Sequence, residues 1–222
     1  MAKAFMGLLT ALLLLSIPSL PAVRASPGTI ELIGKEWNHD PLKVYIAASP
    51  AFRKYVDHVK IALNDWSSAL ESASGKTVDN SEIGVSAADN IFDFVIVDSP
   101  RDADIVIHIR GGAYAGVLGI TIFLDVDGDG FFDKVVITVK VGPGAGPEDF
   151  RNVVRHEIGH ALGLGHSDDP SDLMYPTYDA STTNIDVLPS SLDIGALLTI
   201  YGNDGFGGEN LSPAQIPTSY SA

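Results

Sequence analysis

The stretch HEIGHALGLGH at 156–166 constrains this chain most, because it places three of the six histidines at fixed spacings around one glutamate. Residues four apart lie on the same face of a helix, so His156 and His160 can present two imidazole groups to one metal ion. Glu157 follows the first histidine, where its carboxylate can accept a proton from water on the metal. The pattern therefore predicts a helical zinc site with Glu157 as the general base.

A third ligand requires the chain to turn back after this helix. Gly163 can make the turn, because glycine adopts left-handed backbone angles at little cost and often follows a helix end. The turn can bring His166 to the open side of the metal, which leaves a fourth position for water, as in catalytic zinc sites. Cysteine, the usual closing ligand of structural sites, is absent from the chain. We therefore expect one catalytic zinc ion rather than a helix with incidental histidines.

Residues 150–202 resemble a known family. HExxHxxGxxH followed by a methionine turn is the metzincin signature, and DLMYP at 172–176 matches that turn. Within the metzincins the sequence is similar to matrixins, because Ser167 follows the third histidine and residues 173–178 read LMYPTY. The resemblance implies a zinc-dependent metalloendopeptidase of bacterial or archaeal type, without the cysteine that blocks the zinc in animal matrixins. The strands before residue 150 match by pattern only.

The resemblance also implies further site residues. Met174 would lie beneath the zinc without binding it, although a methionine here can also be read as core filler. The strand that contains Leu118, Gly119 and Ile120 would form the sheet edge above the cleft. An extended peptide can add to such an edge as a further strand, so we expect these three residues to contact the substrate. Tyr178 would line a pocket for one substrate side chain.

The fold class that these patterns predict is α+β. We expect a metzincin, or zincin-like, catalytic domain with a twisted, mostly parallel five-stranded sheet and an antiparallel edge strand. Runs of β-branched residues bounded by turn residues predict the strands. They lie at 41–47, 92–97, 103–109, 118–124 and 134–140. A small C-terminal subdomain would hold the methionine turn.

Three helices complete the expected domain. Apolar residues recur at spacings of three and four over residues 52–70, which predicts a helix that packs on the sheet. Asp65 falls off this stripe, so we expect it on the solvated surface. Pro147 suits the first turn of the active-site helix. Ser190 and Asp193 resemble a capping box, which predicts the start of the last helix.

Four aspartates alternate around a glycine turn between the last two predicted strands. They resemble the first half of an EF-hand loop, whose alternating oxygens suit calcium, but Val136 stands where the bidentate glutamate would be. A calcium site and an acidic turn without an ion are therefore both open. The aspartates are Asp125, Asp127, Asp129 and Asp133. A second, structural zinc is not expected, because His108 is the only histidine in the region 108–134.

The first 25 residues have the pattern of a secretory signal: a lysine, an apolar run, two prolines and small residues up to Ala25. An uncleaved membrane anchor is the alternative, although the apolar run is short for a span. We therefore expect a signal at 1–25, a catalytic domain at 26–202 and a flexible tail at 203–222. The mature protein would be secreted, extracellular and monomeric, without membrane contact.

The acidic composition disfavours nucleic acid as a partner, and an alternative to the peptidase function remains open. The formal net charge of −14 disfavours nucleic acid, so we expect polypeptide substrates. A catalytically silent extracellular module that binds zinc or calcium is the main alternative. Glu157 argues against it, because a purely structural zinc site needs no general base.

Overall fold

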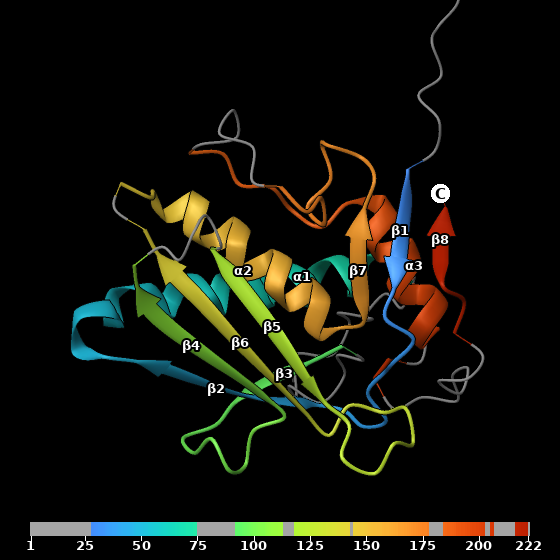
Figure 1. Ribbon diagram of the computed structural model, residues 1–222, viewed down its shortest axis with the longest axis horizontal. Coiled ribbons are helices and arrows are strands. Elements are labelled where there is room, and N and C mark those ends of the chain that lie inside the picture. The colour runs from blue at the N-terminus through green and yellow to red at the C-terminus, as the bar shows by residue number, and fades with distance from the viewer. Residues whose placement is uncertain are drawn as a thin grey trace, which may run out of the picture.

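The computed structural model describes residues 28–74, 92–112, 118–142, 144–177, 184–202, 205–206 and 216–221. The predicted signal at 1–25 and the predicted pocket residue Tyr178 lie outside these ranges. Figure 1 shows a main sheet with two long helices behind it, and a smaller group of strands with a third helix at its side. Among the described helices, none is long and apolar enough to cross a membrane.

The main sheet has the strand order β3-β2-β4-β6-β5. Its strands are β2 (Leu42–Ala48), β3 (Phe94–Ile96), β4 (Ile105–Gly111), β5 (Gly119–Leu124) and β6 (Lys134–Val141). Four of them are parallel, and β5 runs antiparallel to β6 at one edge. The predicted α+β fold, with a five-stranded, mostly parallel sheet and an antiparallel edge strand, is confirmed.

The three predicted α-helices are present: two pack against the main sheet, and the third packs against the first helix and the smaller group of strands. They are α1 (Val56–Ser74), α2 (Pro147–Ala161) and α3 (Ser191–Tyr201), and a 3-10 turn, η1 (Pro50–Tyr55), precedes the first. The predicted capping box begins α3, because Ser190 Oγ accepts from Asp193 N at 3.1 Å and Asp193 Oδ2 accepts from Ser190 N at 2.9 Å. In α2, the Asp149 carboxylate accepts from Gly146 N at 2.9 Å, which satisfies an amide at the start of the helix.

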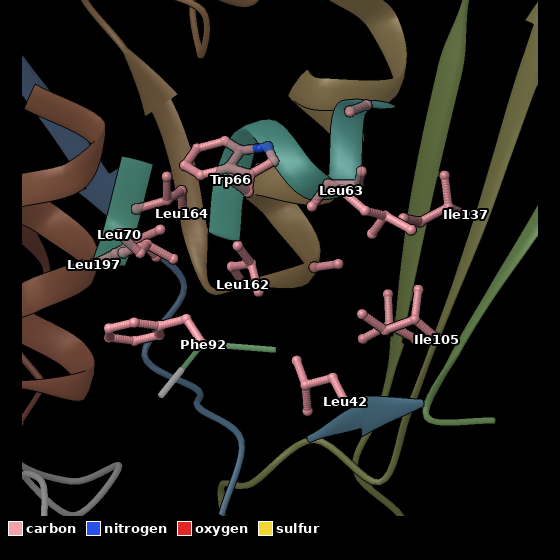
Figure 2. Close-up of a cluster of buried hydrophobic side chains, with 14 of the residues drawn as sticks. Leu42, Leu63, Trp66, Leu70, Phe92, Ile105, Ile137, Leu162, Leu164 and Leu197 are labelled. Atoms are coloured by element: carbon pink, nitrogen blue, oxygen red, sulfur yellow. The ribbon is translucent and has the colours of Figure 1, made fainter. Parts of the chain in front are cut away.

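One hydrophobic core joins the sheet to all three helices (Figure 2). Trp66 of α1 is fully buried between the helices and the sheet, and its Nε1 donates to Arg155 O of α2 at 3.0 Å. Leu162 and Leu164, which follow α2, are also fully buried in this core. The helix that carries the histidine motif is therefore fixed on its inner side before any metal binds.

A second, three-stranded antiparallel sheet was not predicted. Its order is β7 (Leu164–Ser167), β1 (Thr29–Leu32) and β8 (Ser219–Ser221). The flexible tail predicted for 203–222 is therefore wrong for β8. The tail was predicted from the many Gly, Ser and Pro residues of this segment. Its few apolar residues were not taken into account, and two of them, Phe206 and Ile216, are buried.

Candidate active site

Three histidines from two elements meet at one point beside the main sheet. His156 and His160 lie one turn apart on α2, and His166 lies on β7. One ligand nitrogen of each residue lies within 4.8 Å of those of the other two. Their ring centroids are 4.7, 4.9 and 5.5 Å apart. The structure thus brings together the three residues that the sequence predicts as metal ligands.

The turn that returns the chain to the metal site depends on Gly163. This residue has a φ of 105°, which side-chain-bearing residues rarely adopt. Its N–H donates to His160 O at 3.0 Å, which closes the helix end. A Cβ atom here would lie only 2.8 Å from the Lys35 carbonyl oxygen. The turn predicted from the sequence is confirmed, and it places His166 opposite the two helical histidines.

Hydrogen bonds fix the orientation of the two helical histidines. Nδ1 of His156 lies 2.8 Å from Leu173 O, and Nδ1 of His160 lies 2.8 Å from Leu164 O. A carbonyl only accepts, so each Nδ1 carries the proton and each Nε2 has a free lone pair. Burial also lowers the pKa of both rings, that of His160 to about 4. These two imidazole nitrogens, together with one from His166, fit a metal ion such as zinc, which accepts nitrogen ligands.

Met174 lies directly beneath the helical part of the site. Its side chain is fully buried, and a Cβ atom added to Gly159 of α2 would lie 2.4 Å from the Met174 Sδ. Its carbonyl accepts from Ser167 N at 3.0 Å, next to the third histidine. The methionine turn therefore contacts both elements that carry the ligands, and its thioether packs against α2.

Glu157 points from α2 toward the edge strand β5. It is 5% exposed, and Thr121 Oγ1 donates to its Oε2 at 2.5 Å. Burial raises the pKa of Glu157 to about 7, and the hydrogen bond from Thr121 opposes that rise. Sequence reasoning did not single out Thr121. The alternation of side chains along a strand could have indicated this residue, because Thr121 lies on the same strand face as Gly119.

Gly119 gives the Glu157 carboxylate its space. A Cβ atom at this position would lie 2.2 Å from Glu157 Oε1, which is closer than any real contact. The glutamate therefore lies in a notch of β5 that has a glycine at one end and the Thr121 hydroxyl at the other. A carboxylate is thus held beside the three histidines that could bind a metal, in the same cleft.

The cleft has a volume of about 570 Å³ and contains the histidines and the glutamate. On one side it is lined by Leu118, Gly119 and Ile120, which the sequence predicts as substrate contacts. The opposite wall comes from the chain after the methionine turn and includes Tyr175, Pro176 and Val187. This arrangement leaves room for an extended chain between the edge strand and that wall.

The acidic connection between β5 and β6 brings together only three of its four predicted residues. Carboxylate oxygens of Asp125, Asp127 and Asp133 lie within 4.8 Å of one another, and Asp129 does not belong to this group. Asp125 is paired with Lys35, which lowers the pKa of its carboxyl. The other carboxylates accept hydrogen bonds from amides of the same loop. These hydrogen bonds within the loop stabilise the turn.

Comparison with known proteins adds independent evidence. The family model described as Matrixin matches residues 37–202. Matrilysin of Felis catus is 32% identical over 169 residues, which cover 68% of this chain and 53% of that protein. Matrix metalloproteinase-20 of Homo sapiens is 31% identical over 200 residues, 84% of this chain and 35% of that protein.

A third relative, neutrophil collagenase of Homo sapiens, is 50% identical over 50 residues, which cover 22% of this chain and 10% of that protein. The chain thus spans about half the length of these relatives or less. The family match covers most of the chain, including the three histidines, the glutamate and the methionine turn. The chain therefore belongs to the matrixin family.

Proposed function

We propose that this protein is a zinc-dependent metalloendopeptidase that hydrolyses extended polypeptides outside the cell. One observation carries the proposal: His156, His160 and His166 converge at the floor of an open cleft, with the buried carboxylate of Glu157 beside them. Family membership supports it, as does the likeness to a protein named matrix metalloproteinase-20.

His156 and His160 would hold zinc through their free Nε2 atoms, and His166 would supply the third imidazole nitrogen. When bound, zinc supplies a Lewis acid that polarises the scissile carbonyl and acidifies water. Glu157 accepts the proton of the attacking water at its carboxylate and then donates it to the leaving amine. The burial that raises the pKa of Glu157 makes its carboxylate a better proton acceptor.

Thr121 and Gly119 keep the Glu157 carboxylate in place during this transfer. The hydroxyl of Thr121 donates to Oε2, and Oε1 lies against Gly119. The main chain of β5 binds the substrate, because an edge strand presents unpaired backbone groups to an added peptide strand. Recognition through the main chain suits unfolded segments of many sequences.

Removal and return of the metal test this proposal. The purified protein is incubated with an unstructured substrate such as casein, before and after treatment with a zinc chelator and then with added zinc. The proposal predicts hydrolysis, its loss on chelation and its recovery with zinc at about one ion per chain. A folded protein that binds one zinc ion and does not cleave casein or unstructured peptides would instead be a silent zinc-binding module.

A further inference from the structure

Asp186 is an exposed residue whose carboxylate joins a polar network with two arginines of α2, of which Arg155 is buried. Both Arg151 and Arg155 of α2 donate to its carboxylate. Arg151 does so through Nε and Nη2, at 2.8 and 2.6 Å, and Arg155 through Nη1, at 2.8 Å. The pKa of Asp186 is lowered to about 2, first by Arg151 and then by Arg155. The charged carboxylate is therefore held by two cations of one helix.

The two arginines are themselves anchored. Arg155 is 1% exposed, and its Nε donates to Asp65 Oδ2 of α1 at 2.7 Å. Arg151 Nη2 donates to Glu148 Oε1 at 3.0 Å. The prediction that Asp65 is a solvated surface residue is therefore wrong, because the sequence does not show that a buried arginine of α2 lies opposite it. Asp65 and Glu148 thus hold the two arginines in addition to Asp186.

Asn152, between the two arginines on α2, binds the backbone on both sides of Asp186. Its Nδ2 donates to Ile185 O at 2.7 Å, and its Oδ1 accepts from Val187 N at 2.9 Å. The same Oδ1 accepts from Arg155 Nη1 at 2.9 Å. Three consecutive residues, 185–187, are thus held by hydrogen bonds to one face of the active-site helix.

Of these three residues, Val187 lines the cleft, together with Asn152, Val153 and Leu173. We call the segment 185–187 the wall. Ile185 and Leu188 are 57% and 55% exposed, so the burial of these two side chains does little to hold the segment. Val187 packs against the hydrophobic core, and the polar contacts to α2 add a second restraint on the position of the wall.

We propose that Asp186 is a positioning residue that determines substrate specificity. Its ion pairs with Arg151 and Arg155 fix the wall at 185–187 and so set the size of the apolar substrate side chain that the cleft accepts. Asp186 acts through these contacts and does not touch the reacting atoms. The inference rests on the proposed peptidase function and adds to it the class of substrate side chain and the residue that selects it.

Quenched fluorescent peptides that differ in one residue beside the scissile bond, first on one side of it and then on the other, test this role. The series runs through alanine, valine, leucine and phenylalanine. For Asp186→Asn, which keeps the shape of the side chain, and for Asp186→Ala, we expect the ratio of kcat/KM between the best and worst peptides to fall by about tenfold. The change should lie mainly in KM, because the metal site and Glu157 are untouched.

Glu148→Gln is the matched control. It removes another carboxylate partner of Arg151 without touching the wall, so the ratio should stay within about twofold of the wild type, as expected for a surface substitution. An Asp186→Asn enzyme with the same peptide preference as the wild type would overturn the inference. So would an equal loss of preference in Glu148→Gln, because the effect would then come from the helix as a whole.

Hydrogen exchange at the Val187 amide gives a readout that does not need activity. Exchange should become at least several-fold faster in Asp186→Asn and stay unchanged in Glu148→Gln, because only the first variant releases the wall. Unchanged exchange in both variants would refute the proposal that Asp186 fixes the segment 185–187. If the wild type cleaves none of the peptides, the proposed function and the specificity role fail together, while the exchange result still decides whether Asp186 holds the wall.

Discussion

At the scale of single residues, Gly119 and Glu157 show how one methyl group can control the site. A Cβ atom at position 119 would overlap Glu157 Oε1, which is the mobile end of a side chain and can move away. We expect Gly119→Ala to lower kcat on the order of 100-fold, since misplacement of a catalytic group by about 1 Å has effects of that size. The melting temperature should change little.

The control for this substitution is Gly142→Ala, because a Cβ atom at Gly142 meets nothing within 4 Å. Its kcat should equal that of the wild type in the same peptide assay. Wild-type kcat in Gly119→Ala would show that the notch in β5 does not set the position of the glutamate.

Glu36 is a second residue whose environment makes a measurable prediction. It is 2% exposed, its Oε2 has no hydrogen-bond partner, and burial raises the pKa of its carboxyl to about 7. Between the ordinary pKa of 4.5 and this value the folded state binds more protons than the unfolded state. The free energy of unfolding should therefore fall as pH rises through that window.

Glu36→Gln should remove the part of this pH dependence that Glu36 contributes, because the amide stays neutral throughout. Urea unfolding at several pH values measures the effect. The variant should be more stable than the wild type above pH 7 and similar to it below pH 4.5, the two pKa values that bound the window. Parallel stability curves for the two proteins across this range would contradict the assignment to Glu36.

At the scale of elements, the small sheet joins the end of the described chain to a metal ligand. β8 pairs with β1, and β1 pairs with β7, which carries His166. Tyr220 of β8 also packs so closely on α3 that a Cβ atom at Gly195 would lie 2.4 Å from its hydroxyl oxygen. The strand is therefore packed into the domain through both its backbone and its central side chain.

Tyr220→Ala should destabilise the protein by about 2 kcal/mol, because a half-buried aromatic side chain is lost from a packed position. Urea unfolding followed by fluorescence measures this change. Ser219→Ala, at an exposed position of the same strand, should leave the free energy of unfolding nearly unchanged. Equal stability of Tyr220→Ala and the wild type would mean that β8 contributes nothing to the fold.

At the scale of the whole molecule, local patterns in the sequence predicted the features that depend on residues close together in the chain. The helix stripe, the five main strands, the turn at Gly163 and the histidine set all follow from spacings of a few residues. The contacts that were missed join residues far apart: β1 with β8, Thr121 with Glu157, and Asp65 with Arg155. Such pairs depend on how distant elements pack together, so no local spacing in the sequence indicates them.

The most direct test of the whole account compares the wild type with Glu157→Ala in two measurements on the same preparations: zinc content by mass spectrometry and the rate of peptide hydrolysis. The account predicts about one zinc ion per chain in both proteins, since the three histidines are intact. It also predicts a rate for the variant lower by a factor on the order of 1,000, because general-base assistance is lost. A zinc-loaded Glu157→Ala that cleaves as fast as the wild type would contradict the central claim.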